Sequence, residues 1–175
     1  MAVITNYRMK RLLEAAEPIS EARLPLDLRE CAEGEWGRSS SGVLTPDGPP
    51  PSWTARLAGA DPEELMKAEL DVNDIRVDDE DLTGDPHTYL SKVVARGFLF
   101  AGSCLLRARN LPEAGDLRAV MSTGITEDFL IHGTTVKFFL RRGGLPKCFH
   151  DVEGYKIEGL APISIDDLPV LGFET

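Results

Sequence analysis

Hydrophobic positions recur at helical spacing in the first two thirds of the chain. The apolar residues from Ile4 to Ala16 return every three or four positions, and Thr5 is a capping residue at their start. This pattern predicts a helix over residues 5–17. Pro18 ends that helix because proline does not fit a helix interior. A shorter helical turn is expected over residues 26–31.

Two dipeptides mark the starts of further helices. Asp61-Pro62 and Asp85-Pro86 each place a side-chain acceptor at the cap and proline in the first turn. The first of these helices is expected to run to about Leu70. The second carries apolar residues along one face and is expected to reach about Leu106. One more short helix is expected over residues 112–121.

The pattern changes to strands after Gly124. Runs of β-branched and aromatic residues flank Gly133, which predicts a hairpin. The strands expected in this part of the chain are residues 125–132, 134–141, 147–152 and 155–160. Helices followed by strands predict an α+β fold, with helices packed on a C-terminal antiparallel β-sheet.

A change in composition suggests how the chain is organised. Glycine, proline and serine make up 13 of the 27 residues from 34 to 60. We expect residues 34–60 to be a flexible linker between an N-terminal helical arm, 1–33, and an α+β domain, 61–175. Trp36 and Trp53 lie in this linker. Because an indole is costly to leave in water, each is expected to dock on the protein or on a partner.

The length and composition of the chain are typical of one soluble domain that is large enough to bury a hydrophobic core. The chain has 175 residues, of which 42% are hydrophobic and 27% charged. The longest apolar stretch, Gly97 to Leu106, is too short to span a bilayer, so no transmembrane segment is expected. Three cysteines, widely spaced and odd in number, fit reduced thiols. A cytoplasmic location is therefore expected.

The negative charge of the chain is concentrated in one place, which we call the acidic segment, residues 69–85. It contributes −7 of the formal net charge of −10. Arg76 is its single base, and its acids are Glu69, Asp71, Asp74, Asp78, Asp79, Glu80, Asp81 and Asp85. Such a cluster suits a cation or a basic partner, or stays solvated, and it disfavours nucleic acid as a partner.

The acidic segment matches the start of a calcium loop. Residues 79–84 supply alternating oxygen ligands and then a glycine, as an EF-hand does. The twelfth position of that loop is Leu90, where the motif requires a bidentate glutamate. This departure favours a solvated acidic loop, so no metal is expected there.

Asp79, Asp81 and Thr83 also have the D-x-D-x-T spacing, which resembles the first motif of haloacid-dehalogenase-type phosphatases over five residues. The resemblance implies Asp79 as nucleophile and Asp81 as general acid. Acids near the C-terminus, Asp166 or Asp167, would then help to hold Mg²⁺. The family has an apolar strand before the first aspartate, whereas this chain has a mostly charged run.

One group of residues has the composition of a metal or nucleophile site. Cys148 and His150 are two apart on an expected strand, and His132 lies on a neighbouring one. Zinc sites usually show a second close ligand pair, which this chain lacks. We therefore expect no catalytic residue, metal or cofactor here. No common nucleotide-binding, serine-hydrolase or zinc-protease motif occurs.

These observations favour a small protein–protein interaction protein over an enzyme. Its acidic segment is expected to bind a basic protein surface, as an inhibitor, immunity protein or assembly protein would. The residues expected to bind the partner are Asp71, Asp74, Asp78, Asp79, Glu80, Asp81, Trp36 and Trp53. Two alternatives stay open: a metal-dependent hydrolase or phosphatase using Asp79 and Asp81, and a viral structural, matrix-like protein that self-associates.

Overall fold

The computed structural model describes residues 3–126, 132–146 and 149–174. Short 3₁₀ turns connect the regular elements, and one of them, Ser52–Leu57, follows the proline-rich stretch. The helices are α1 (Tyr7–Ala15), α2 (Leu26–Glu33), α3 (Pro62–Val72) and α4 (Pro86–Arg107). The strands are β1 (Gly37–Arg38), β2 (Leu44–Thr45), β3 (Asp74–Val77), β4 (Leu117–Ile125), β5 (His132–Leu140) and β6 (Glu158–Ser164).

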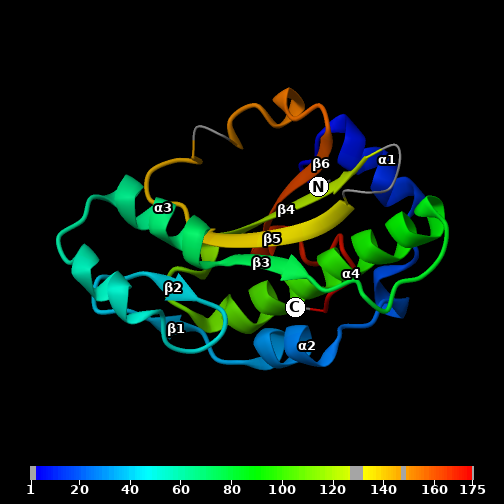
Figure 1. The fold of residues 1–175 in the computed structure, drawn as a ribbon. Helices are drawn as coiled ribbons and strands as arrows, with labels where there is room; N and C mark the ends of the chain where they lie inside the picture. Colours follow the sequence, from blue (N-terminus) through cyan, green and yellow to red (C-terminus); the bar gives the residue numbers. More distant parts are fainter. Residues whose placement is uncertain (1–2, 127–131, 147–148, 175) are drawn as a thin grey trace.

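The main sheet has four antiparallel strands in the order β3-β5-β4-β6 (Figure 1). Strands β1 and β2 pair separately in a small second sheet. The edges of the main sheet are therefore β3 and β6. This arrangement confirms the predicted α+β fold with helices packed on a C-terminal antiparallel sheet.

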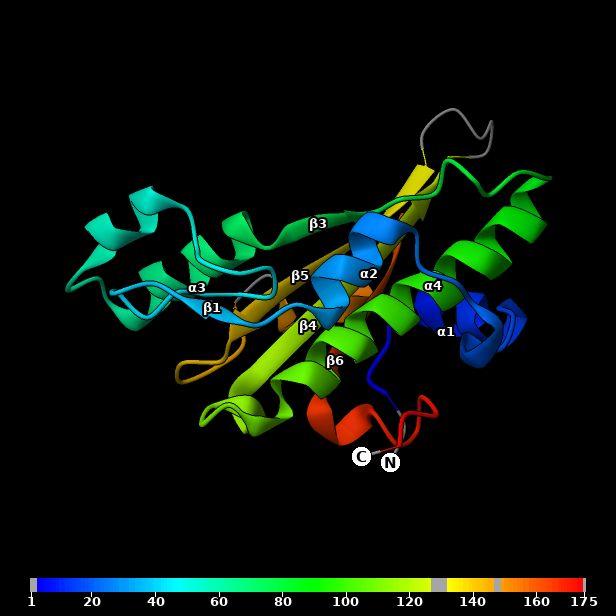
Figure 2. The ribbon, with the colours of Figure 1, turned by 90° about the horizontal axis from the view of Figure 1, so that it is seen from below.

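Helix α4 lies across one face of the sheet (Figures 1 and 2). Asp85 caps it by accepting hydrogen bonds from the backbone N–H groups of His87, at 2.9 Å, and Thr88, at 3.2 Å, as the sequence predicted. With the turn that follows it, the helix is long and apolar enough to cross a membrane by length and composition alone. However, 67% of the most apolar stretch of 18 residues in this helix is buried inside the protein. It is packed as the core helix of a globular domain.

The two N-terminal helices pack on α4, and α1 also lies against β6. Met9 of α1 and Leu28 of α2 are buried in the same hydrophobic cluster as the apolar face of α4. Trp36 joins this cluster, because its indole N–H donates to the Cys104 carbonyl at 3.1 Å and its ring meets Phe138 edge-on at 5.6 Å. The predicted arm thus contributes to a core that it shares with α4. Its independence as a folding unit stays a prediction.

Several predicted boundaries differ from the structure. The helix predicted over residues 112–121 is wrong, because Leu117 begins β4. β4 is a central strand paired on both sides, so long-range pairing decides its conformation and no local signal marks its start. β3 was not predicted at all, because two of its four residues are charged. An edge strand with one solvated face accommodates such a sequence.

The remaining strand predictions were partly correct. β5 confirms the strand predicted over 134–141, and β6 overlaps the one predicted over 155–160. The strand predicted over 125–132 includes residues 127–131, which lie outside the described residues. The strand predicted over 147–152 begins outside them as well, and its described part has no strand structure.

Candidate functional site

Glu69, the first residue of the acidic segment, is a buried structural anchor. It is 0% exposed and forms a bidentate ion pair with Arg142, whose two guanidinium nitrogens donate to the Glu69 carboxylate oxygens at 2.6 and 2.7 Å. Its carboxylate also accepts hydrogen bonds from the backbone N–H groups of Leu44, at 3.0 Å, and Leu140, at 2.8 Å. Glu69 therefore joins α3 to β2 and β5, and it is not available to a partner.

Asp79 and Asp81 also have partners within the chain. Asp79 is buried; its carboxylate accepts a hydrogen bond from the Tyr89 hydroxyl at 2.6 Å and pairs with Arg76 at 3.3 Å. Burial, and next the Asp79 carboxylate, raise the pKa of Tyr89 well above its usual value. Asp81 accepts two hydrogen bonds from the buried Arg96, at 2.6 and 2.7 Å, and that interaction lowers the pKa of Asp81. These two acids hold the loop between β3 and α4 in place.

His132 lies beside this network rather than in a metal site. Its Nε2 is 3.9 Å from Asp79, and its ring meets Tyr89 edge-on at 4.8 Å. His150 lies instead within 2.8 Å of the Leu145 carbonyl, and Cys148 is outside the described residues. Across the described part of the chain, no three Asp, Glu, His or Cys side chains converge as a metal site.

The groups required for a phosphatase lie at opposite ends of the sheet. Ser164, which precedes Asp166 and Asp167, pairs with Arg118 at the start of β4. Val77, the last residue of β3, and Thr123 of β4 both pair with Thr134 of β5, near the other end of β4. Asp79 lies two residues after Val77. Five residues of strand span about 17 Å. The geometry therefore does not bring together the acids that the hydrolase alternative needs.

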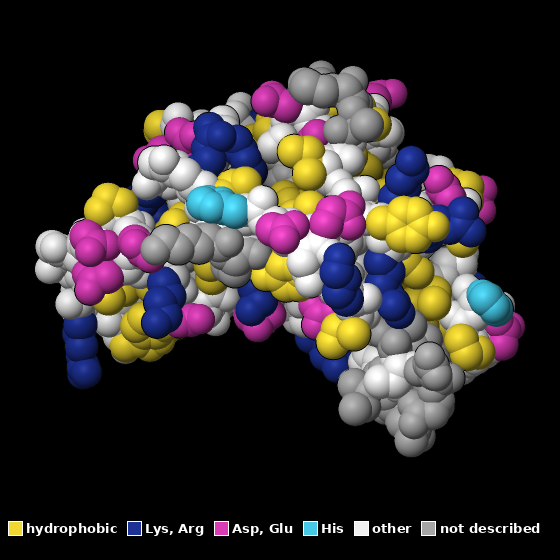
Figure 3. Space-filling model, turned by 90° about the horizontal axis from the view of Figure 1, so that it is seen from above, with side chains coloured by type: hydrophobic (Ala, Val, Ile, Leu, Met, Phe, Trp, Pro, Cys, Tyr) yellow, Lys and Arg dark blue, Asp and Glu magenta, His cyan; other side chains and the backbone are white. Residues whose placement is uncertain are grey.

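Asp71 and Asp74 line a groove on the sheet face opposite α4. Two lysines line the same groove of about 480 Å³, and one of them, Lys137, pairs with Asp74 at 2.8 Å. On this face, seen in Figure 3, acidic and basic side chains are interspersed with hydrophobic ones. Glu158 lines it as well, so three acids face two lysines and most of the charge of this groove is balanced.

Asp78 lies in a different place, which we call the acidic cleft. This cavity of about 510 Å³ is lined by residues of the edge strand β3, of α2 and of the segment 45–51. Asp27 and Asp47 line it together with Asp78. The base that lines it, Arg76, is paired with Asp79. The cleft therefore gathers three carboxylates whose charge is not balanced by another described lining residue.

A close approach of two backbone segments builds the wall that carries Asp47. A side chain at Gly37 would overlap the carbonyl group of Gly48, so only glycine fits there. Gly48 itself has a positive φ of 69°, and its carbonyl accepts a hydrogen bond from the Thr45 hydroxyl at 2.6 Å. The resulting tight turn leaves Asp47 exposed at the cleft.

Prolines line the acidic cleft, and one exposed tryptophan follows them in the chain. Pro49 and Pro51, from the triple proline of the sequence, form part of its wall. Trp53 begins two residues later and is 44% exposed. Glu80 is exposed next to the cleft, and its backbone N–H donates to the Asp78 carboxylate at 3.1 Å. Among the residues predicted to bind a partner, Asp78 and Glu80 are thus accessible in or next to the cleft, and Trp53 is exposed two residues after Pro51.

Sequence reasoning missed Asp27 and Asp47. Asp27 is an acid in the first turn of α2, and Asp47 follows a proline in the predicted linker. Both positions are common for aspartate in helices and turns, so neither carries a functional signal by itself. Only the packing of α2 and the turn beside β3 brings them to the same cavity as Asp78.

Comparisons of the chain with protein-family models, with curated proteins and with solved structures give no match. The geometry of the site is therefore the basis for a functional proposal.

Proposed function

We propose that this protein binds another protein by receiving a lysine or arginine side chain of a basic surface in the acidic cleft. The observation that carries the proposal is the convergence of Asp27, Asp47 and Asp78 on one cavity whose arginine is already paired. This keeps the predicted class of function, an interaction protein with an acidic binding surface. It moves the centre of that surface from the whole acidic segment to the cleft.

Electrostatics and apolar contact have separate tasks in this proposal. Carboxylates gathered in a concave site focus a negative potential, which steers a basic partner and raises the rate of association. A lysine or arginine stem would pack against Pro49 and Pro51 while its charged end reaches the carboxylates. The exposed Trp53, two residues after Pro51, would supply the apolar anchor that tight interfaces need. Inhibition, immunity and assembly all fit this mode of binding.

A matched pair of triple variants tests the proposal. The cleft variant is Asp27→Asn, Asp47→Asn, Asp78→Asn. The control is Glu21→Gln, Glu63→Gln, Glu174→Gln, which changes the net charge equally at exposed positions outside the cleft. Each protein is used to capture partners from extract of its native cell, at about 50 and 500 mM salt. Zero-length carbodiimide coupling then maps which carboxylates contact partner lysines.

We expect the wild type and the control variant to retain one basic protein at about 50 mM salt. The cleft variant should not retain it, and about 500 mM salt should release it from all three proteins. The coupling products should join Asp27, Asp47 or Asp78 to a lysine of that protein. Equal retention by the cleft variant would contradict the proposal. Coupling products that involve only Asp71 and Asp74 would instead assign the interface to the groove opposite α4.

A further inference from the structure

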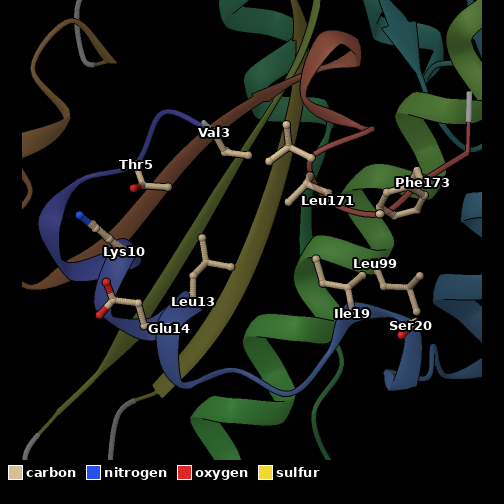
Figure 4. A pocket seen from close by; sticks show the side chains of 12 residues that line it. Val3, Thr5, Lys10, Leu13, Glu14, Ile19, Ser20, Leu99, Leu171 and Phe173 are labelled. Atoms are coloured by element: carbon tan, nitrogen blue, oxygen red, sulfur yellow. The ribbon is translucent and has the colours of Figure 1, made fainter. Parts of the chain in front are cut away.

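A further cavity lies on another side of the molecule. It has a volume of about 890 Å³ and lies between α1, the Ile19–Glu21 turn, α4 and the C-terminal residues 170–173 (Figure 4). We call it the α1 groove. It shares no lining residue with the acidic cleft. A ligand in the α1 groove would therefore contact none of the residues that line the acidic cleft.

The α1 groove has an apolar end and a polar end. In Figure 4, the side chains of Leu99, Leu171 and Phe173 surround one end of the space, and Leu13 extends toward its middle. Three polar side chains gather at the other end: Thr5, Lys10 and Glu14. A ligand that fits this arrangement has a long apolar part and a polar head.

The charge at the polar end selects the sign of that head. Glu14, the acid at this end, is already paired with Arg11 at 3.2 Å. Lys10 is exposed and forms no ion pair with any residue in the described part of the chain. The positive charge of Lys10 is thus left for a ligand while the charge of Glu14 is matched by Arg11, so this end suits an anion.

Packing holds the walls of the groove in place. A side chain at Gly102 of α4 would overlap the ring of Phe173, so Phe173 lies directly on the helix. The backbone N–H of Phe173 donates to the Leu168 carbonyl at 3.0 Å. On the opposite wall, Asn6 fixes the start of α1 by accepting hydrogen bonds from the N–H groups of Met9, at 2.8 Å, and Leu160, at 3.0 Å. A preformed site loses less conformational freedom when it binds.

We propose that the α1 groove binds a single-chain anionic amphiphile, such as a fatty carboxylate, with the chain on the apolar wall and the carboxylate at Lys10. The cavity lies within the range of about 300–1,000 Å³ that is usual for small-molecule sites. Its mainly apolar lining with a few polar groups at one end is also usual for such sites. The single basic end favours one head group rather than a peptide with charges along its length.

Titration calorimetry with two matched ligands tests this proposal. Dodecanoate and dodecanol have chains of the same length, and only the first carries a charge; both are used as monomers, below any aggregation. The wild-type protein is expected to bind one dodecanoate. The variant Lys10→Gln should bind dodecanoate about threefold more weakly, as for an exposed ion pair, and dodecanol unchanged. The control Lys67→Gln lies on α3, outside the groove, and should bind both ligands as the wild type does.

A second variant tests the apolar wall. Leu171→Asp introduces a charge beside the groove on the C-terminal segment, and it should abolish binding of both ligands while thermal unfolding stays cooperative. Equal binding of dodecanoate to wild type and Lys10→Gln would overturn the proposal. The proposal would also be overturned if monomeric ligand failed to bind while the protein sedimented with vesicles of phosphatidylglycerol. A protein dimer that is detected by sedimentation and dissociated by Leu171→Asp would overturn it as well. Those last two results would assign the groove to a membrane surface or to a second copy of the chain.

Discussion

At the residue scale, two bidentate ion pairs illustrate how burial decides what a carboxylate contributes. Arg142 and Arg96 are both mostly buried, at 17% and 4% side-chain exposure. Their acids differ, because Glu69 is 0% exposed whereas Asp81 is 62% exposed. Removing an acid that is buried with its partner leaves an uncompensated charge inside the protein. Removing an exposed acid lets water take its place.

The first prediction concerns Glu69. The variant Glu69→Gln should lower the free energy of unfolding by about 3 kcal/mol, because Arg142 then keeps a charge without its carboxylate. The exposed Glu63→Gln on the same helix is the control and should stay within about 0.5 kcal/mol of wild type. Urea denaturation followed by circular dichroism measures both values. Equal stability of the two variants would show that water, not Glu69, satisfies Arg142.

The second prediction concerns the pH dependence of stability. The hydrogen bond from Arg96 depresses the pKa of Asp81 in the folded protein. A depressed folded pKa contributes stability that is fully present above the unfolded pKa, about 3.9, and is lost as the pH falls through the folded pKa. Asp81→Asn should therefore be less stable than wild type at pH 7, and the two should converge below about pH 4. Because Asp81 is mostly exposed, the difference should be small.

Denaturation midpoints from pH 2 to pH 7 measure this convergence. Asp71→Asn serves as the control, since Asp71 is exposed and has no ion pair with another described residue. At pH 7 the free energy of unfolding of this variant should stay within about 0.5 kcal/mol of the wild type. A constant gap between Asp81→Asn and wild type over the whole range would show that Arg96 does not act on the titration of Asp81.

At the element scale, the seam between α2 and α4 places two thiols in different surroundings. Cys31 of α2 borders the acidic cleft, and the neighbouring Cys104 thiol lowers its pKa. Cys104 of α4 is fully enclosed, and burial raises its pKa well above the usual value. The thiolate is the reactive form of cysteine. The two residues should therefore react at very different rates, although both lie in the hydrophobic core.

The third prediction follows from that contrast. In a Cys148→Ser background, iodoacetamide at pH 8 should alkylate Cys31 at least tenfold faster than Cys104, which should react only after denaturation. Peptide mass spectrometry at timed intervals measures both rates. The alkylation rate of Cys31 should reach half its maximum at a pH below 9, because the ordinary thiol pKa is 9.0 and the pKa of Cys31 is lowered. Equal rates would mean that the α2–α4 seam opens as a unit on the labelling timescale.

Elements with local signals were predicted from the sequence, and elements held by distant partners were not. Asp61 caps α3 with the reciprocal bonds of a capping box, and Asp85 caps α4, so their starts were correct. β4 gave no such signal, since its residues become a strand by pairing with β5 and β6. The same distinction applies to the site. Asp78 belongs to a recognisable charge cluster, whereas Asp27 and Asp47 join it only through tertiary packing.

At the scale of the whole molecule, the question is whether the N-terminal 33 residues unfold with the rest. The sequence predicted an arm joined by a flexible linker. In the structure, α1 lies beside α4 and β6, and α2 packs on α4, so that Met9, Leu28 and Cys31 are buried in the core cluster around α4. The backbone N–H of Asn6 also donates to the Leu160 carbonyl at 3.0 Å. Removing these contacts would expose the outer face of α4.

Hydrogen exchange on the full chain decides between an arm and a shared core. Amides that open only with the whole domain report the global free energy of unfolding, and those of a separate unit report a lower value. We expect the hydrogen-bonded amides of α1 and α2 to exchange with the same free energy as those in the middle of α4. Urea should lower all three with the same slope. Opening of α1 and α2 at a distinctly lower free energy, with α4 still protected, would restore the division at residues 34–60. Because α2 forms one wall of the acidic cleft, that result would also make the cleft dependent on a segment that detaches.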